Sequence, residues 1–348
     1  MTARQAFIVQ AESCDRLGSP FTARVCRIVA ERLEADSDVA RRILAWKGDP
    51  SKRSDALPLR FTAALHGLVL EERAPELAAL YPPNHENITD DALWDAICGT
   101  IDRFPRYILN RLSWPPQTNE CMRSAALCPG FLTIADRIGL PLVTSELGAS
   151  AGLNLIWDRY SYRFGDAEWG PKTAPVTIAP EWSGPPPPLV DAKVLERAGC
   201  DHVPTDLREP PDRLRMQSYI WADQVERMER INAAMDLTRD TGIQIITRDA
   251  LDWLTDRLAL RLQGSVHVVY HSVFWQYLNR FAKVSAVELL SEAGNRATPE
   301  APLAWLRFEG DGRDPGGAIL LTLWPGGETH RLGRADYHGR WVDWTGWE

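Results

Sequence analysis

Residues 140–154 read LPLVTSELGASAGLN, and this stretch decides the fold. Its first half is a short apolar run that stops at Gly148, a pattern typical of a strand buried on both faces. Gly148 and Gly152 follow the run, and small residues there let the backbone turn tightly and approach a ligand. The sequence therefore predicts a strand over residues 140–147, a tight turn, and a helix that begins near Ala151.

Strands and helices alternate downstream of this turn. Strands are predicted at residues 242–247 (GIQIIT), 266–270 (VHVVY) and 302–308 (PLAWLRF). Helices are predicted at residues 251–262 and 282–293. Alternation of this kind is typical of a parallel α/β sheet. The last segments, 318–324 and 329–344, flank Pro-Gly-Gly and predict an antiparallel hairpin that closes the sheet.

The first 138 residues carry a different pattern. Apolar residues recur there at three- and four-residue spacing, which predicts amphipathic helices over 57–80, 90–104 and 119–138, and no strand. The sequence thus predicts a helical N-terminal domain, 1–138, and an α/β domain, 139–348. The α/β domain contains a proline-rich insertion at about residues 165–215, whose path the sequence does not predict.

Composition narrows the classes of partner. The 348 residues carry a net charge of −8 and no block of Lys and Arg, which argues against a nucleic acid. No stretch approaches the roughly 20 apolar residues of a membrane span, so we expect a cytoplasmic protein with no membrane contact. Its six cysteines form no CxxC pair, and we expect buried thiols and no metal site.

The turn after the first strand resembles motif I of class I S-adenosylmethionine methyltransferases, and with the C-terminal hairpin it suggests their Rossmann-like sheet. An acid, Glu146, ends the strand, although Ser150 stands where the middle glycine is usual. On this resemblance the cofactor-binding candidates in the turn are Glu146, Gly148, Ala149, Ser150, Gly152 and Asn154. The alternative is a turn that uses its glycines only for packing.

An acid also follows the strand GIQIIT. Asp249 would face the crevice where α/β sheets bind ligands, and in methyltransferases an acid at this place often accepts a bond from the adenine amino group. It is equally suited to cap the helix that follows, and both roles are compatible. The acid that would bind the ribose is not identifiable from the sequence, and Asp166 and Glu181 are guesses.

Residues 270–277, YHSVFWQY, end the strand VHVVY and supply catalytic candidates. An imidazole titrates near neutrality, so His271 is a candidate general base. Trp275 could stack on adenine or face a sulfonium cation. The alternatives are a core histidine and a packing tryptophan. Ser272, together with Asn119 and Glu120, completes the catalytic set. The alternative for Asn119 and Glu120, which lie at a helix start, is a role as a cap only.

Two other functions fit the same residues. Residues 148–152 spell GxSxG, the nucleophile elbow of α/β-hydrolases, with Ser150 as nucleophile and Asp249 with His271 or His338 as partners in chain order. The helical first 138 residues supply no strands for the front half of a hydrolase sheet, however. The third possibility is a non-catalytic binding or scaffold protein, in which the protein's own side chains fill the cleft.

The chain also resembles a bacterial family, domain of unknown function 2332. The resemblance covers nearly the whole chain and lies in residues 116–120 (PQTNE), 124–127 (SAAL), 146–155 (ELGASAGLNL), 158–160 (DRY), 270–278 (YHSVFWQYL) and 338–344 (HGRWVDW). It implies a methyltransferase-like fold, and with it S-adenosylmethionine as cofactor and an unknown small molecule as methyl acceptor. A fold alone does not establish a chemistry.

Overall fold

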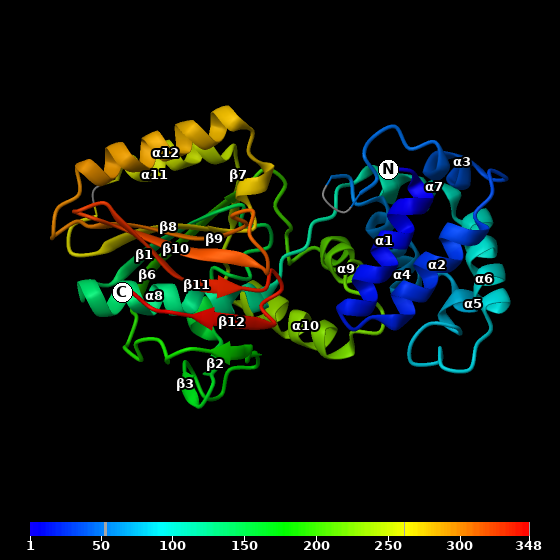
Figure 1. The fold of residues 1–348 in the computed structure, drawn as a ribbon, viewed down its shortest axis with the longest axis horizontal. Helices are drawn as coiled ribbons and strands as arrows, with labels where there is room; N and C mark the ends of the chain where they lie inside the picture. The colour runs from blue at the N-terminus through cyan, green and yellow to red at the C-terminus, as the bar shows by residue number, and fades with distance from the viewer. Residues whose placement is uncertain (52–53, 261, 348) are drawn as a thin grey trace. The chain divides into compact units, whose positions relative to one another are not determined.

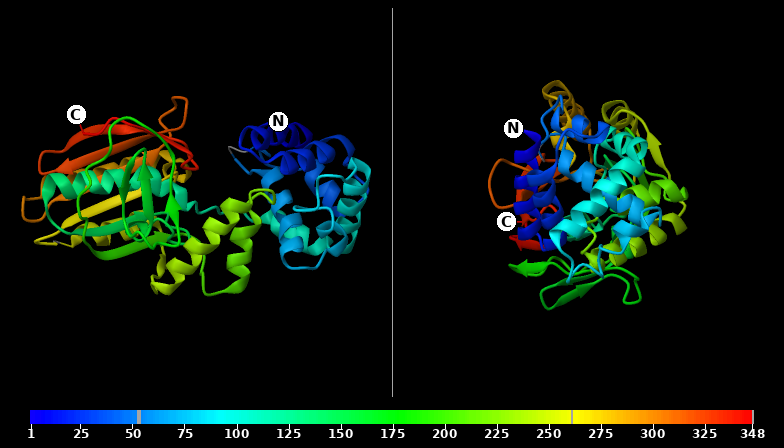
Figure 2. Two further views of the ribbon diagram at one scale, coloured as in Figure 1. Left: turned by 90° about the horizontal axis from the view of Figure 1, so that it is seen from below. Right: turned by 90° about the vertical axis from the view of Figure 1, so that its right-hand side faces the viewer.

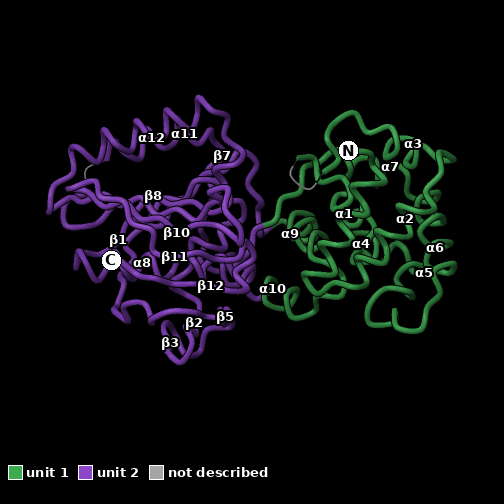
Figure 3. Tube along the Cα trace, viewed as in Figure 1, with its two compact units in different colours: residues 1–118, 209–232 green, residues 119–208, 233–348 purple. Residues whose placement is uncertain are grey.

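A computed structural model describes residues 1–51, 54–260 and 262–347. The chain divides into two compact units, coloured separately in Figure 3. Unit 1 contains residues 1–118 and 209–232, and unit 2 contains residues 119–208 and 233–348. The boundary predicted at residue 138 falls at the end of a helix inside unit 2, and the chain returns to unit 1 within the stretch predicted as an insertion.

Unit 1 is helical. Its helices are α1 (Ala3–Arg16), α2 (Pro20–Arg32), α3 (Asp38–Leu44), α4 (Leu57–Leu70), α5 (Pro75–Ala78), α6 (Asp90–Arg103), α7 (Pro105–Ser113), α9 (Pro210–Ser218) and the first half of α10 (Val225–Asp240). Local sequence starts several of them: Thr2 and Gln5 form a capping box on α1, and Thr89 caps α6. The predicted helical N-terminal region is confirmed, since the described residues before β1 contain no strand.

Unit 2 is built on a large mixed sheet, so the α/β class is confirmed. The strands of unit 2 are β1 (Leu142–Leu147), β2 (Ser161–Phe164), β3 (Ala167–Trp169), β4 (Thr177–Ile178), β5 (Glu181–Ser183), β6 (Val194–Asp201), β7 (Ile245–Thr247), β8 (Val266–Ser272), β9 (Leu303–Glu309), β10 (Gly317–Trp324), β11 (Glu328–Ala335) and β12 (Trp341–Trp344). Nine of them form one sheet in the order β5-β12-β11-β10-β9-β8-β1-β6-β7. Neighbours from β7 to β9 pair in parallel, whereas β9 to β12 form an antiparallel meander that contains the predicted hairpin.

Helices cover both faces of this sheet (Figures 1 and 2). α11 (Ala250–Ala259) and α12 (Arg280–Asn295) pack together on one face, and α8 (Ser124–Ile138) packs on the other against β9 and β10. Every residue of β1 and β8 is buried as a result. Strands buried on both faces are rich in apolar residues, and the Leu and Val residues of these two made them recognisable in the sequence.

The sequence misidentified the segment that follows β1. In place of a helix, residues after Ala151 form turns and a short 3-10 helix, η2 (Trp157–Arg159). Residues 151–157 are all buried, so this part of the segment has no solvent-facing side. Its backbone is satisfied by side chains, because the hydroxyls of Tyr160 and Tyr162 donate to the carbonyls of Leu153 and Trp157, both at 2.6 Å.

The proline-rich stretch contains a central strand that the sequence analysis missed. β6 lies beside β1 in the sheet, while β2, β3 and β4 form a small separate sheet and β5 joins the far edge of the large one. Only the end of β6 is buried, and its sequence, VLERAGCD, has neither an apolar run nor strict alternation.

In the described residues no helix is long and apolar enough to cross a membrane.

Candidate functional site

The order in which successive strands are added to the sheet reverses between β1 and β8, and the carboxyl ends of these two strands mark that point. From β1 the parallel strands run to β6 and β7 on one side, and to β8 and β9 on the other. In open α/β sheets the loops on the two sides of such a point diverge and leave a crevice that binds ligands. The turn after β1 and the loop after β8 are therefore the places to look for a site.

The turn after β1 is tightly wound. Gly148 and Gly152 have φ of +71° and +80°, and Ser150 has φ of +53° without being glycine. A Cβ on Gly148 would lie 2.3 Å from the Phe274 ring in the loop after β8, so the two loops touch at this point. A non-glycine residue with positive φ carries backbone strain, and such strain gathers at functional sites.

Asp201, at the end of β6, holds the turn. Its Oδ2 accepts a hydrogen bond from the Ser150 backbone N–H at 2.9 Å, and its Oδ1 accepts one from the Val203 N–H. The Ser150 carbonyl in turn accepts from Thr205 N–H at 3.2 Å. The carboxylate retains lone pairs for further donors, such as ligand hydroxyls.

The Ser150 hydroxyl has no partner. Its Oγ is buried and makes no hydrogen bond among the described residues, although its backbone is bonded on both sides. Leaving a buried hydroxyl unsatisfied costs on the order of 1–3 kcal/mol, so proteins seldom keep one without a reason. Ser150 therefore carries an unused donor and acceptor within the turn.

Glu146, at the end of β1, is buried beneath the turn. The hydroxyl of Tyr270, on β8, donates to its Oε2 at 3.1 Å. Burial raises the pKa of Glu146 to about 8, while the Tyr270 bond and the nearby Arg123 oppose that rise. Glu146 therefore titrates near neutrality and is mostly protonated at pH 7.

Asn119, Glu120 and Asn154 form a buried network behind the turn. Asn119 Oδ1 accepts from Leu153 N–H at 2.9 Å, and Asn154 Oδ1 accepts from the Ser124 hydroxyl at 2.8 Å. Asn154 Nδ2 donates to the Glu120 carbonyl, and Glu120 Oε1 accepts from the Met122 N–H. These contacts position the chain that precedes α8 against the turn.

Asp249 lies at the end of the neighbouring strand, β7. Its Oδ1 accepts from the N–H groups of Leu251 and Asp252 at 2.8 and 3.4 Å, so it caps α11, one of the two roles that the sequence allows. β7 pairs with the end of β6 through Thr247 and Asp201, which puts both acids on the same edge of the sheet. The guesses Asp166 and Glu181 lie elsewhere, between β2 and β3 and in the edge strand β5.

His271 is enclosed by protein partners. Its Nδ1 bonds Glu309 Oε1 at 2.7 Å, and its Nε2 accepts from the Trp305 indole at 3.1 Å, so Nδ1 carries the proton. The ring is completely buried and stacks on Trp275 at 5.0 Å between centroids. In this arrangement neither nitrogen is left for a substrate. Ser272, the last residue of β8, is also buried.

Glu309, at the end of β9, organises the loop after β8. Its Oε1 accepts from His271 and from the N–H groups of Phe274 and Trp275 at 2.9 and 3.1 Å. Within this loop Val273 has φ of +53°, a strained value for a β-branched residue. Glu309 thus fixes the backbone of the loop through three donors on one oxygen.

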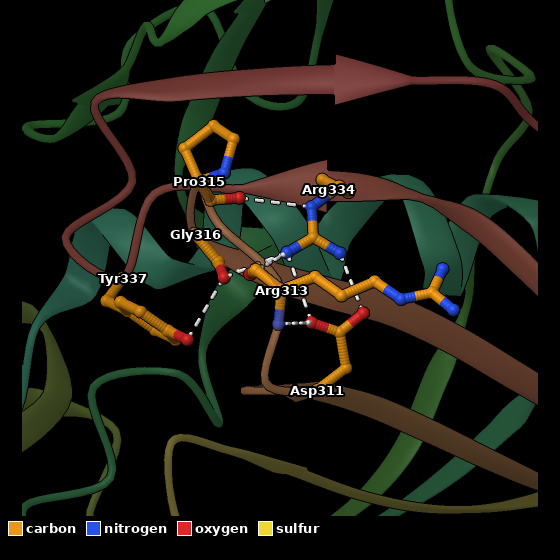
Figure 4. A network of polar contacts seen from close by, with 6 residues as sticks. All are labelled: Asp311, Arg313, Pro315, Gly316, Arg334 and Tyr337. Carbon is orange, nitrogen blue, oxygen red and sulfur yellow. Dashed lines mark hydrogen bonds and ion pairs between the residues drawn. The ribbon is translucent and has the colours of Figure 1, made fainter.

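The loop that follows Glu309 is fixed as well (Figure 4). Arg334, on β11, donates to both carboxylate oxygens of Asp311 and to the carbonyls of Arg313, Pro315 and Gly316. The Tyr337 hydroxyl also donates to Gly316 O, at 3.0 Å. The meander therefore anchors the β9 end of the site.

Arg123 lies at the same edge. It ends the 3-10 helix η1 (Cys121–Arg123), and its Nε donates to Tyr337 O at 3.2 Å. Burial lowers the pKa of its guanidinium, and four acidic groups nearby oppose that shift, namely Glu120, Tyr277, Glu309 and Glu146.

An open cavity of about 310 Å³ borders the turn on its β6 and β7 side. Its lining includes Ala151, Thr205 and Thr247, whereas Asp201 and Asp249 are outside the lining. The volume is at the lower end of the range for small-molecule sites.

All six cysteines are free, and no group of three or more His, Cys, Asp and Glu suited to a metal occurs in the described residues.

Three of these residues were not predicted from the sequence: Arg123, Glu309 and Tyr270. Asp201 was not among the predicted site residues either. The position of Asp201 at a strand end would have drawn attention to it, but β6 itself was not recognised. Tyr270 ends one predicted strand and Glu309 directly follows another, and that placement was a usable signal.

Comparisons with known proteins identify a family and nothing more specific. Residues 4–344 match the family described as "Uncharacterized protein conserved in bacteria (DUF2332)". No curated protein and no solved structure matches the chain. Because the match covers almost the entire chain, this protein belongs to the DUF2332 family of bacterial proteins.

Proposed function

We propose that this protein is an S-adenosylmethionine-dependent methyltransferase that acts on a small molecule. The observation that carries the proposal is the pairing of the strained turn after β1 with a carboxylate at the end of β6. Asp201 holds the turn through Ser150 N–H and retains lone pairs, as an acid that accepts the two ribose hydroxyls would. The parallel order β7-β6-β1-β8-β9, with its change of direction at β1 and β8, supports the same reading.

The residues present fit the cofactor. The unpaired Ser150 hydroxyl and the backbone of residues 148–152 suit its methionine part, and Asp201 suits the ribose. Asp249 suits the adenine amino group. The cofactor would supply an electrophilic methyl group, and the protein's main task is to hold the acceptor in line with it. Glu146, whose pKa burial raises to about 8, is mostly protonated at pH 7 and could accept the acceptor's proton only in its minor ionised form.

Two features depart from the usual methyltransferase. No helix begins in the turn after β1, so that helix dipole is absent from the cofactor side. In addition, Phe274 contacts the turn at Gly148. A ligand in the crevice would have to lie beside this ring or displace it. Blockage by Phe274 is the arrangement expected if the fold serves as a non-catalytic scaffold.

A thermal-shift experiment tests the proposal. S-adenosylmethionine or S-adenosylhomocysteine at a hundred times its dissociation constant should stabilise the fold by about 2.7 kcal/mol and raise the melting temperature by a few degrees. NAD and ATP should give no rise, and the rise should diminish in Asp201→Asn and Asp249→Ala. Equal melting temperatures with and without both ligands would reject the proposal.

A serine hydrolase is the second candidate, because Ser150 combines positive φ with an unpaired hydroxyl in GxSxG. Against it, no histidine in the described part of the chain bonds the Ser150 hydroxyl, and both nitrogens of His271 are occupied. A fluorophosphonate probe should label Ser150 in a hydrolase and leave Ser150→Ala unlabelled. Absence of labelling in the wild type would remove this candidate.

A further inference from the structure

Arg307, on β9, is a partly buried cation without an anion. Its Nη2 donates to the Thr322 hydroxyl at 2.8 Å, and its guanidinium carbon lies 3.9 Å from the centre of the Trp305 ring. Its Nε is buried without a hydrogen bond, and Arg307 forms no ion pair among the described residues. Burial lowers the pKa of Arg307 to about 10. Because proteins normally pair a desolvated charge, this guanidinium is suited to an anion that the chain does not supply.

Arg331, on β11, lies on the same face of the sheet. Leu320, on β10, pairs with Arg307 on one side and with Arg331 on the other, and directly paired residues share a face. The Cα atoms of the two arginines are therefore two strand spacings, or roughly 10 Å, apart. The Arg331 side chain is exposed and makes no hydrogen bond and no ion pair among the described residues. Both arginines can thus reach one anion above Leu320.

A lysine of α12 borders this face. A Cβ on Gly294 would lie 2.4 Å from the Trp324 ring, so the Gly294 side of α12 faces β10. Trp324 is four residues from Leu320 on that strand and therefore points to the same face. Lys283 precedes Gly294 by eleven residues, or three helical turns, and lies on the same side of α12. Within the part of the chain that the structure describes, Lys283 has no ion pair.

The acidic side chains near this face have other partners. Glu309 follows Arg307 on the same face, but its Oε1 accepts three hydrogen bonds from the end of β8 and the loop after it. Glu328 pairs with Leu323 on the opposite face, and its Oε2 lies 3.7 Å from His330 Nε2. The three cations therefore share an open face without a carboxylate partner among the described residues.

We propose that Arg307, Arg331 and Lys283 form a binding site for the phosphate group of a small phosphate monoester. A doubly charged group gains from all three cations, whereas a carboxylate carries one charge and suits a single arginine. The organic part of the ligand would lie against Leu320, which is only partly buried. This site does not rest on the proposed methyltransferase function, because it uses no residue of the turn after β1.

Isothermal titration calorimetry at constant ionic strength tests the proposal. Glycerol 3-phosphate carries the phosphate monoester, acetate carries a single charge, and glycerol is neutral. We expect glycerol 3-phosphate to bind the wild type at least tenfold more tightly than acetate, and glycerol to show no binding. Arg307→Gln should weaken the binding of glycerol 3-phosphate at least tenfold, and Arg331→Gln and Lys283→Gln several-fold. Arg163→Gln, at an exposed arginine on β2, should leave it unchanged.

Arg307→Lys guards against a folding defect, because it keeps the charge and loses only the planar fork. It should retain the wild-type circular dichroism spectrum and bind glycerol 3-phosphate several-fold more weakly. Unchanged binding in Arg307→Gln would overturn the proposal. Equal binding of acetate and glycerol 3-phosphate would overturn the choice of a phosphate.

Two more probes distinguish the sources of a phosphate group. Inorganic phosphate carries the charge without an organic part, and vesicles that contain phosphatidic acid present it as a lipid headgroup. Tighter binding of glycerol 3-phosphate than of inorganic phosphate would support a small monoester. The reverse order, or sedimentation with the vesicles that is lost in Arg307→Gln, would overturn that choice of ligand.

Discussion

The turn after β1 and the loop after β8 differ in how completely their polar groups are used. Each follows a buried parallel strand, and each contains a non-glycine residue with φ of +53°, Ser150 in one and Val273 in the other. In the loop after β8, Glu309 accepts three donors and His271 has both ring nitrogens bonded. In the turn after β1, the Ser150 hydroxyl is buried and unpaired.

This difference suggests that the loop after β8 supports the site and that the turn after β1 binds the ligand. A loop whose polar groups are all satisfied within the protein gains little from a ligand, and its strain is maintained by its own hydrogen bonds. A turn with an unsatisfied hydroxyl gains a hydrogen bond when a ligand enters. We therefore assign ligand contact to the turn after β1, and assign His271 and Glu309 to positioning the opposite wall.

The largest effect is expected from Glu309→Ala, which leaves three buried or partly buried donors without their acceptor. We expect a loss of about 3 kcal/mol in the free energy of unfolding, measured by urea denaturation. Glu292→Ala, at an exposed position on α12, should change it by less than about 0.5 kcal/mol. A similar, small change in both variants would show that Glu309 does not hold the loop.

Glu146 should make stability depend on pH. The folded protein holds the Glu146 proton up to a pH of about 8, while the unfolded chain releases it at about pH 4.3. The folded state therefore binds more protons between these values, and Glu146 lowers stability as the pH rises through that window. Glu146→Gln should remove this contribution, so that its stability relative to the wild type increases between pH 5 and pH 8.

The increase should be on the order of 3 kcal/mol, measured by urea denaturation at both pH values. Glu196→Gln, on the exposed part of β6, serves as the control and should show no comparable trend. A constant difference between Glu146→Gln and wild type from pH 5 to pH 8 would mean that Glu146 is ionised throughout.

Asp201→Asn tests whether the carboxylate that holds the turn after β1 also binds the cofactor. An amide nitrogen would face one of the two backbone N–H groups that now bond the carboxylate, and the negative charge would be lost. We expect calorimetry to give at least a tenfold higher dissociation constant for S-adenosylhomocysteine, equivalent to about 1.4 kcal/mol. Asp249→Asn should have a smaller effect, and the reverse ranking would contradict the assignment of Asp201 to the ribose.

The smallest effect is expected from removal of the buried Ser150 hydroxyl. Ser150→Ala removes an unsatisfied buried group and should raise the unfolding free energy of the ligand-free protein by about 1 kcal/mol. Ser124→Ala, the same change at a buried serine that bonds Asn154 Oδ1, should lower it by about 1 kcal/mol. Matching signs in the two variants would show that the Ser150 hydroxyl has a partner in solution.

Sequence alone identified the elements whose pattern is local. The apolar runs of β1 and β8, the helical spacing of unit 1 and the cap at Asp249 all follow from neighbouring residues. The turn at residues 148–152 was also recognisable, because its small residues are consecutive. These features placed Glu146, Ser150 and Asp249 on one edge of a sheet before any contact was known.

Other features depend on contacts between residues distant in the sequence, and only the tertiary structure shows them. A helix was predicted to begin near Ala151, yet residues 151–157 are all buried. Side chains replace the helical hydrogen bonds there, namely those of Asn119 and Tyr270, which are distant in sequence, and of the nearby Tyr160. β6 pairs with β1 from within a proline-rich stretch, and that pairing brings Asp201 to Ser150. The partners of His271 depend on contacts between segments more than thirty residues apart, which no local pattern encodes.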